Sequence, residues 1–383
     1  MQLKQQLIEI RRRIHQHPEL GFEEFETAKL IEETLRKYGI ETKRLAKTGV
    51  VGLLRGNGER TIALRADMDA LPIQELNQVE YASKIPGKMH ACGHDVHVTC
   101  LLGAAIVLSN RRNALRGNVK FIFQPAEEAP GGAKPMIEEG VLEDPKVDVI
   151  VGGHCWPGLP AGCIEVGEGP VMAAPDVLTL KIIGKGGHGA MPHTTVDAIA
   201  VAFQVGVALQ QVVSRMSDPL DPVVLTIGSI SGGTAPNVIA QEVLMKGSIR
   251  SLSPETHEKL PRIIEQVVKG VTSAYGATYE MDYYNLYPPT INDPKVAQMV
   301  LKAAEKALGP GKALWSRYPS MGGEDFSYFT QKIPGAFFRI GVSDPSKQRP
   351  SYPLHSPNFD VCEDAIPAAV SVLVQIVEDY LNQ

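Results

Sequence analysis

Apolar side chains recur at every third or fourth position near both ends of the chain. Over residues 3–14 they form a stripe opposite a charged face, which is the pattern of an amphipathic helix, and the stripe stops at His17-Pro18. The same spacing predicts a second helix over 25–38 and a closing helix over 365–381. Both ends of the chain are therefore expected to be helical.

Short, continuous apolar runs between these helices predict strands that are buried on both faces. They lie at 50–54, 61–64, 119–123, 147–151 and 336–340. Because predicted strands and helices alternate along the chain, we expect them to form one α/β domain with a mainly parallel sheet.

The middle of the chain follows a different order. Its predicted elements run β-α-β-β-α-β, which is the order of a ferredoxin-like sandwich. The strands are expected at 177–183, 223–230, 239–250 and 277–284, and the helices at 195–213 and 255–275. We therefore predict an inserted satellite domain over 176–289. The outer segments, 1–175 and 290–383, would form one discontinuous domain.

Composition narrows the functional classes. A chain of 383 residues is long for one core and fits two domains. Its hydrophobic fraction of 44% is ordinary for a globular protein, and a formal net charge of -5 gives no reason to expect nucleic acid as a partner. No apolar run approaches the roughly 20 residues needed to cross a bilayer, and residues 1–20 lack a signal-peptide core. Five scattered cysteines do not suggest a disulfide framework, so a reducing cytoplasm is expected.

The segment 89–97, which reads MHACGHDVH, is the richest in metal-ligand chemistry, with a thiol, three imidazoles and a carboxylate. Cys92 and His94 are separated by one glycine, so both side chains lie on one side of an extended segment. The apolar residues that follow have helical spacing, which places the cluster just before or within the first turn of a helix. The alternative is a helix start with polar residues and a buried thiol.

Ligand-type side chains also follow three predicted strands. Asp67 and Asp69 alternate along the chain, so they point the same way and suit a metal site or the orientation of a ligating histidine. Glu127 and Glu128 are neighbours whose side chains diverge, so one can bind metal while the other takes a proton from water. His154 follows the third strand. Each has a structural alternative, but sites in α/β proteins gather at strand ends.

Four further polar residues are candidates by their setting. In the predicted insert, His188 lies in a glycine-rich loop, Asn237 follows Ala-Pro, and Arg250 lies at a strand end. His355 lies in a proline- and serine-rich loop near the C-terminus. Taken singly, each of the three in the insert is more often structural than functional.

Eight short motifs are spread along the chain. They are RADMDALP (65–72), MHACGHDVH (89–97), QPAEE (124–128), GGHCWP (152–157), GKGGHGAMPH (184–193), GGTAPN (232–237), MGGEDF (321–326) and LHSPNF (354–359). Together they resemble the dinuclear-metal amidohydrolase and carboxypeptidase family. Within that family they are similar to the branch of aminoacylases, hippurate hydrolases, auxin-conjugate hydrolases and bacterial N-acyl-amino-acid deacylases.

The resemblance implies a role for individual residues. Two divalent metal ions would be held by Cys92, His94, Glu128, His154 and His355. Glu127 would be the general base, and Asp69 would support the ligands. His188 would contact the substrate carbonyl across a dimer interface. The substrate-binding residues would be Asn237, Arg250 and Gly323, the first two at the substrate's carboxylate.

One motif departs from the carboxypeptidase side of that family, where a His-x-Asp unit supplies the first ligand. Here the place reads Asp67-Met68-Asp69, and a Cys-x-His pair stands at 92 and 94 instead. A thiolate favours borderline-soft ions such as Zn, whereas imidazole and carboxylate ligands leave Mn, Co and Ni open.

The resemblance implies hydrolysis of the amide bond of N-acyl-L-amino acids by a metal-activated water, with Glu127 taking the proton. The expected partners are this small-molecule substrate, or a short peptide, and further copies of the chain in a homodimer or larger homo-oligomer. Four alternatives remain: a metallocarboxypeptidase or dipeptidase, an N-acetyl-diaminopimelate deacetylase, a hydrolase with Cys92 as nucleophile, and a non-catalytic zinc-binding scaffold. Neither nucleic acid nor a membrane is expected as a partner.

Overall fold

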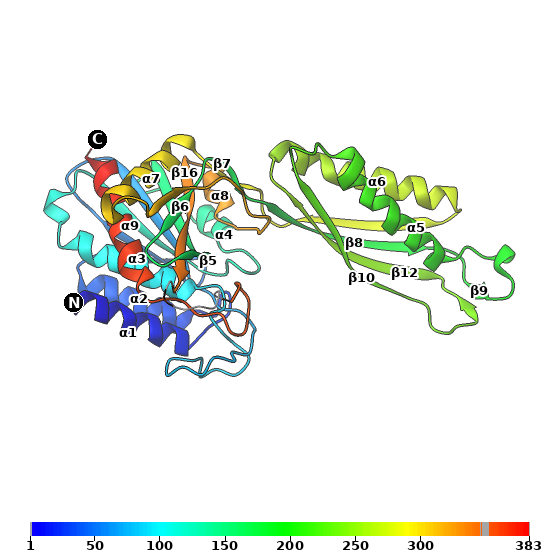
Figure 1. Cartoon of the computed structure of the whole chain (residues 1–383), viewed down its shortest axis with the longest axis horizontal. Helices are drawn as coiled ribbons and strands as arrows, with labels where there is room; N and C mark the ends of the chain where they lie inside the picture. Colours follow the sequence, from blue (N-terminus) through cyan, green and yellow to red (C-terminus); the bar gives the residue numbers. More distant parts are fainter. Residues whose placement is uncertain (1, 345, 347–351, 383) are drawn as a thin grey trace. The chain divides into compact units, whose positions relative to one another are not determined.

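The computed structural model describes residues 2–344, 346 and 352–382, which form two compact units (Figure 1). Unit 1 comprises Met1–Gly169, Ile291–Arg317 and Tyr328–Gln383, and unit 2 comprises Pro170–Thr290 and Tyr318–Ser327. The sequence placed 318–327 in the outer domain. In the structure this segment groups with unit 2, where the Ala173 amide donates to the carbonyls of Ser320 (3.1 Å) and Gly322 (2.9 Å).

Unit 1 is built on an eight-stranded sheet with the order β1-β2-β4-β3-β5-β16-β6-β15. Its centre, β4-β3-β5-β16, is parallel. The pairs β1-β2, β2-β4 and β16-β6 are antiparallel, and the edge pair β6-β15 is parallel again. The strands are β1 Glu41–Leu45, β2 Gly49–Leu54, β3 Thr61–Asp67, β4 Asn118–Gln124, β5 Val149–Pro160, β6 Ile164–Val166, β15 Ala313–Trp315 and β16 Gly335–Ser343.

The apolar stripes of the helices in unit 1 correspond to their contacts with one another and with the sheet. Helices α3 and α9 pack on each other and on β3, while α1 contacts α3 and α7 contacts α9. Nearly every residue of α3 is buried, which fits its lack of a single apolar stripe: after the polar first turn, apolar residues lie on all its sides. These helices are α1 Gln2–Gln16, α2 Phe25–Lys37, α3 His94–Ser109, α4 Ala133–Glu138, α7 Pro294–Leu308 and α9 Ala365–Leu381.

Unit 2 has its own hydrophobic core and a four-stranded antiparallel sheet with the order β10-β12-β8-β13. Helices α5 and α6 pack against each other and on this sheet, so the βαββαβ sandwich predicted from the sequence is confirmed. Asp197 and Ser253 cap the two helices by accepting backbone N–H bonds. These elements are β8 Ala174–Ile183, α5 Ala198–Gln211, β10 Val223–Gly232, β12 Glu242–Ser251, α6 Pro254–Ala274 and β13 Thr278–Asn285.

Short elements complete the described chain, and two of them change the predicted pattern. The predicted strand 239–250 is split, because β11 leaves the main sheet to pair with β9 before β12 begins. The short elements are η1 Arg112–Ala114, β7 Gly169–Met172, β9 Gly187–His188, η2 Pro192–Thr194, η3 Val212–Met216, β11 Val238–Ile239, β14 Thr290–Asn292 and α8 Ser327–Thr330.

Strand β5 is longer than predicted. The sequence pattern ends it at residue 151, whereas hydrogen bonding to β16 continues it to Pro160, so His154 lies inside a strand and not after one. Gly153 permits this pairing, since a Cβ there would lie 2.7 Å from Phe338 Cζ. A contact between distant strands therefore overrides the local turn signal of the two glycines.

The outer side of α5 is apolar and exposed. With η3 it forms a helix over Ala198–Met216 that is long and apolar enough to cross a membrane, by length and composition only, and 28% of its tested window is buried. The sequence shows no uninterrupted apolar run of this length, because glutamines divide the apolar residues of this helix. Phe203 and Val207 are 58% and 66% exposed on this helix. We define Phe203, Val207 and their exposed neighbours Ala200 and Gln204 as the α5 face.

Candidate metal centre

The five residues that the resemblance suggests as metal ligands converge in unit 1. The ligand atoms of Cys92, His94 and His154 all lie within 4.8 Å of one another, and so do those of Cys92, Glu128 and His355. Cys92 belongs to both groups. We call these five residues the ligand cluster. Its arrangement around one shared thiol offers two overlapping sites for a cation.

Local backbone geometry brings Cys92 and His94 into the ligand cluster. Gly93, between them, is the N-cap of α3 and has a left-handed φ of 87°. A Cβ at Gly93 would lie 2.9 Å from both Cβ and Sγ of Cys155, so only glycine fits this close approach. His94 is the first residue of α3, as the sequence predicts for this cluster, and its side chain is fully buried.

Asp69 connects His94 with the glutamate pair. Its Oδ1 accepts from His94 Nδ1 (3.2 Å) and from the Glu127 amide (3.0 Å), and its Oδ2 accepts from the Glu128 amide (3.1 Å). His94 Nε2 is buried and has no hydrogen-bond partner among the described residues. A histidine that is fixed through one nitrogen, and whose other nitrogen has a looser contact with Asp67 Oδ1 at 3.8 Å, has the geometry of a metal ligand.

The charge around His94 also favours a cation. Burial opposes a charge on this imidazole, but Asp67, Asp69 and Glu128 outweigh it and raise the pKa of His94 to about 10. A surplus of buried carboxylates therefore attracts positive charge, whether a proton or a metal ion, to His94.

His154 supplies a neutral imidazole. Its Nδ1 donates to the carbonyl of Cys155 (2.8 Å), which leaves the lone pair on Nε2, 3.4 Å from Cys92 Sγ. Burial, with the nearby His97 and His94, lowers the pKa of His154 to about 3. This side chain is therefore ready to bind a metal without first losing a proton.

Glu128 and His355 form the other side of the ligand cluster. Glu128 Oε1 lies 3.1 Å from His355 Nε2. Burial opposes ionisation of Glu128, but His355 and His94 together lower its pKa. His355 has a left-handed φ of 64°, and its amide donates to the carbonyl of Ala91 (2.8 Å), which holds it beside the segment that carries Cys92.

Glu127 is buried beside the ligand cluster and belongs to a further close group with His94 and Glu128. Its neighbour Glu128 is in both this group and the group around His355. The carboxylates of both glutamates therefore approach His94 and each other, contrary to the divergence expected for neighbours on an extended chain, and Glu128 reaches further, to Cys92 and His355.

His97, near the ligand cluster, received no individual role from the sequence, and it pairs with Asp67, for which the sequence suggested a metal site or the orientation of a histidine. His97 Nδ1 contacts Asp67 Oδ1 at 2.5 Å, and His97 Nε2 accepts from the Cys155 amide at 2.7 Å. Both ring nitrogens are therefore occupied, and His97 orients its surroundings instead of offering a lone pair. The alternation of Asp67 and Asp69 was the signal that both carboxylates bind histidines.

The donor set fits metal ions better than a cysteine nucleophile. Burial, then Glu128, Glu127 and Asp67, raise the pKa of Cys92 well above its ordinary value, whereas a nucleophilic cysteine needs a lowered pKa. His154, which lies within reach, is not basic enough to keep the thiol proton. A divalent cation among these acidic groups would instead stabilise the thiolate.

The residues suggested for substrate binding lie in unit 2 and outside its core. His188 on β9 pairs with Val238 on β11, and Asn237, directly before β11, accepts the Gly189 amide with its carbonyl (2.8 Å). His188 and Asn237 are exposed. His188 Nδ1 accepts from the Ala190 amide (3.0 Å), so a neutral ring carries its proton on Nε2.

The glycines beside His188 serve contacts within unit 2. A Cβ at Gly187 would lie 2.6 Å from Thr195 Cγ2, and one at Gly189 would lie 3.0 Å from the Asn237 carbonyl oxygen. Gly323 has a similar role, because a Cβ there would lie 2.4 Å from Pro175 Cγ. These three glycines are therefore explained by packing, whatever their neighbours bind.

Arg250 is half-buried on β12. Burial lowers the pKa of its guanidinium, and Asp176 opposes that change. Asp176 itself is hydrogen-bonded to His257 Nε2 (3.0 Å) and Tyr283 Oη (2.8 Å). Arg250 is thus a cation in a partly desolvated place, where a carboxylate partner is favoured.

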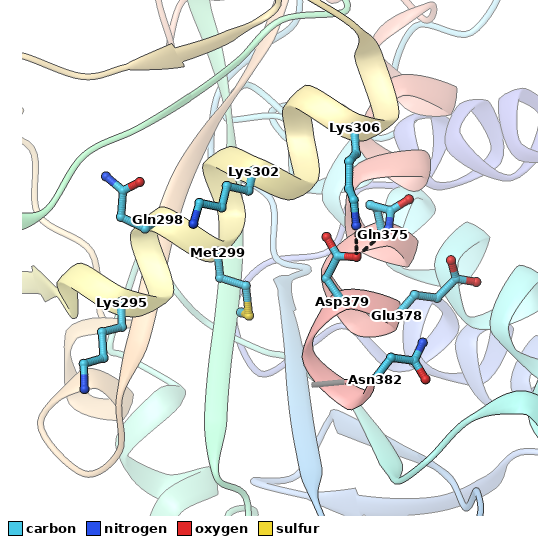
Figure 2. Close-up of a pocket in the computed structure, with 9 residues that line it drawn as sticks. All are labelled: Lys295, Gln298, Met299, Lys302, Lys306, Gln375, Glu378, Asp379 and Asn382. Atoms are coloured by element: carbon cyan, nitrogen blue, oxygen red, sulfur yellow. Dashed lines mark hydrogen bonds and ion pairs between the residues drawn. The ribbon is translucent and has the colours of Figure 1, made fainter.

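A groove away from the ligand cluster lies between α7 and α9 (Figure 2). It encloses about 650 Å³ and is lined by lysines, amides and acids of the two helices, where Lys306 and Gln375 both bind Asp379 (2.6 and 2.8 Å). None of its lining residues is a predicted site residue. The chemistry of unit 1 is therefore concentrated at the ligand cluster and not in this groove.

The chain matches one family model over most of its length. Residues 63–379 match Peptidase family M20/M25/M40. This range includes every residue of the ligand cluster and the whole of unit 2.

Individual proteins agree with this match. The chain is 49% identical over 294 residues to an N-acyl-L-amino acid amidohydrolase of Geobacillus stearothermophilus, covering 76% of this chain and 79% of that one. It is 43% identical to thermostable carboxypeptidase 2 of Saccharolobus solfataricus, covering 94% and 91%. Among solved structures, it is similar to the Bacillus subtilis YXEP protein, a dinuclear metal-binding peptidase of the M20 family, at a TM-score of 0.87 and 36% identity, covering 100% and 99%. This chain therefore belongs to Peptidase family M20/M25/M40 and is a metal-dependent amidohydrolase.

Proposed function

We propose that the protein removes the acyl group from N-acyl-L-amino acids by hydrolysing their amide bond. The observation that carries this proposal is the convergence of five ligand-type side chains around Cys92, with a buried glutamate, Glu127, beside them. The similarity to an N-acyl-L-amino acid amidohydrolase supports the substrate class.

Cys92, His94, Glu128, His154 and His355 would hold two divalent ions, of Zn, Mn, Co or Ni. When bound, the ions would polarise the scissile carbonyl and lower the pKa of a water molecule. Asp69 keeps His94 and both glutamate amides in place for this arrangement.

Glu127 would do the proton transfer. Its carboxylate would accept a proton from the attacking water and then give it to the nitrogen of the leaving amino acid. One group can serve both steps because the proton that it takes in the first step is the one that it returns in the second.

Arg250 would bind the carboxylate of the amino acid, since a planar guanidinium matches a carboxylate with two parallel hydrogen bonds. Asn237 would add a side-chain amide donor, and Gly323 would belong to the same substrate-binding region. The partial desolvation of Arg250 supports this role, because it strengthens the attraction to an anion.

His188 would act on the active site of a second subunit. Its Nε2–H, fixed by the Ala190 amide at the other nitrogen, is a suitable donor to the negative charge that develops on the carbonyl oxygen. The α5 face supports a homodimer or larger homo-oligomer, because a second copy of the chain would remove its exposed apolar side chains from water.

A cytoplasmic location is part of this proposal. All five cysteines are free, which fits a reducing compartment.

A second candidate is a carboxypeptidase or dipeptidase, which the similarity to a carboxypeptidase favours. A panel of N-acetyl, N-benzoyl and longer N-acyl amino acids, assayed beside dipeptides with the same C-terminal residue, separates the two. We expect a higher kcat/KM for the acyl amino acids. Dipeptides that react at least ten times faster would establish the peptidase instead.

A matched pair of substrates tests the carboxylate. The N-acyl amino acid and its C-terminal amide differ only in that charge, so the amide should lose most of its kcat/KM if Arg250 binds a carboxylate. Equal rates would exclude this role.

A further inference from the structure

Glu24 is a fully buried carboxylate that the proposed mechanism does not use. It occupies the N-cap position of α2, yet its side chain makes no capping bond. Glu19 caps that helix instead, accepting from the amides of Glu26 (3.0 Å) and Thr27 (2.9 Å). The buried carboxyl group of Glu24 therefore has another purpose, since glutamate is seldom buried without one.

The two oxygens of Glu24 bind two distant segments. Oε1 accepts from the Ala126 amide (2.9 Å), and Oε2 accepts from Thr48 Oγ1 (2.6 Å). Burial raises the pKa of Glu24 to about 7. A carboxyl group buried at this cost, with both oxygens hydrogen-bonded, points to a specific geometric requirement at its partners.

Of the two partners of Glu24, Ala126 has the unusual backbone conformation. It has a left-handed φ of 51°, which is unfavourable for an alanine, and it directly precedes Glu127 and Glu128. Its amide is held by Glu24, and its carbonyl accepts from the Gly131 amide (3.0 Å). A strained residue of this kind persists only where its surroundings determine it.

Three consecutive amides are thus held by two buried carboxylates. Glu24 binds the amide of Ala126, and Asp69 binds the next two, those of Glu127 and Glu128. The Glu24 and Asp69 segments are themselves joined, because the Ala70 amide donates to the Glu19 carbonyl (2.8 Å).

Gly21 packs closely against the loop 125–131. A Cβ at Gly21 would lie 2.6 Å from the Ala129 carbonyl oxygen and 2.9 Å from Ala126 Cβ. The segment 19–24 therefore acts as the support on which the loop 125–131 lies.

We propose that Glu24 is a positioning residue for the hydrolysis: by holding Ala126 in its left-handed conformation, it directs Glu127 at the substrate and Glu128 into the ligand cluster. This inference rests on the proposed function, in which Glu127 is the general base. Glu24 itself touches neither substrate nor metal.

The central variant is Glu24→Ala, and its matched control is Thr48→Val. Thr48→Val removes only the hydrogen bond to Oε2, whereas Glu24→Ala removes both hydrogen bonds of the carboxyl group and is the variant that frees the Ala126 amide. At saturating metal we expect Glu24→Ala to lower kcat roughly 10- to 100-fold with KM little changed, as for residues that orient metal ligands. Thr48→Val should keep kcat within about twofold, although both variants lose stability.

Two further variants test the geometry. Glu24→Gln keeps an oxygen for the Ala126 amide and should retain most of kcat. The double variant Glu24→Ala with Ala126→Gly should recover at least several-fold in kcat over Glu24→Ala, because glycine adopts the left-handed conformation without strain.

Amide hydrogen exchange gives a readout that does not depend on activity. In peptides covering 124–131, exchange should be faster in Glu24→Ala than in Thr48→Val or in the wild type. Equal exchange, or an equal loss of kcat in Glu24→Ala and Thr48→Val, would overturn the proposal and leave Glu24 a packing residue.

Glu127→Gln, measured in parallel, separates this inference from the proposed function. If Glu127→Gln kept the wild-type kcat, the general-base assignment would fail. Hydrogen exchange in the Glu24 variants would still decide whether Glu24 holds the loop.

Discussion

The polar residues of unit 1 and unit 2 that the sequence selected differ in how firmly they are held. In unit 1, His94 and the two glutamates are bound by Asp69, and His154 is fixed by its neighbour's carbonyl. In unit 2, by contrast, His188 lies on the two-residue strand β9, Asn237 lies directly before the two-residue strand β11, and both side chains are exposed. Unit 1 thus carries preorganised chemistry, whereas the unit 2 residues have geometry that a substrate or a second subunit would have to complete.

Metal removal should have the largest effect on activity, because it acts on the preorganised ligand cluster of unit 1. Treatment with a chelator should abolish hydrolysis, and added Zn, Mn, Co or Ni should restore it. Activity against a chromogenic acyl amino acid before and after exhaustive dialysis provides the measurement. Full activity in metal-free protein would instead support Cys92 as the nucleophile.

Glu127→Gln should lower kcat by roughly 10²- to 10⁴-fold, since it removes the general base. The metal content of this variant should remain that of the wild type. The neighbouring Glu128→Gln is its matched control and should lose metal affinity. A metal-loaded Glu128→Gln beside a metal-free Glu127→Gln would mean that the two roles are reversed.

His188→Ala should lower kcat by roughly 10²- to 10³-fold if the imidazole stabilises the developing oxyanion. Coexpression with Glu127→Gln tests whether it acts on the partner subunit. About half of the dimers would be mixed and half of their sites intact, so roughly a quarter of wild-type activity should return. Inactive mixed dimers, made from parents that fold and bind metal, would confine His188 to its own subunit or to a structural role.

Arg250→Met should mainly raise KM. A hydrogen bond between charged groups contributes about 1.5–3 kcal/mol, which is roughly 10- to 150-fold in KM. Lys246→Met is the control, because Lys246 lies on the same strand at an exposed position of the same parity. A similar KM change in both variants would indicate a general charge effect.

The smallest expected effect is on the stability of the protein and comes from the buried carboxyl group of Glu24. Burial raises the pKa of Glu24 to about 7 from an ordinary 4.5, so the folded protein holds this proton more tightly than the unfolded chain does. The resulting stabilisation is full below pH 4.5 and is lost as the pH rises through about 7.

Glu24→Gln carries no charge at any pH. As the pH rises from 5 to 8, its free energy of unfolding should therefore increase relative to that of the wild type, by at most roughly 3 kcal/mol. Urea unfolding of both proteins at the two pH values measures this gain, with the exposed neighbour Glu23→Gln as the control. An unchanged difference between the proteins at pH 5 and pH 8 would mean that Glu24 does not titrate in this range.

Local patterns predicted the elements, but not the contacts between distant segments. The helical spacing over 3–14 and the strand over 119–123 correspond to α1 and β4, and the βαββαβ order gave the sandwich of unit 2. The extension of β5 past His154 was missed because it depends on pairing with β16, far away in the sequence.

The candidate site shows the same limit. Residue types at strand ends selected Glu128 and His154, and the structure brings them together with Cys92. The support of the glutamate loop by Glu24 has no sequence signal, since a glutamate before a helix usually indicates capping. The roles suggested for His188, Asn237, Arg250 and Gly323 remain predictions, because they depend on a substrate and on a partner subunit.

The most direct test of the account is the number of divalent ions bound per subunit, measured by native mass spectrometry after metal loading. We predict two ions in the wild type and in Glu127→Gln, and fewer in Cys92→Ala, because Cys92 belongs to both close groups of ligand atoms. Two tightly bound ions in Cys92→Ala, or none in an active wild type, would contradict a dinuclear centre built around this thiol.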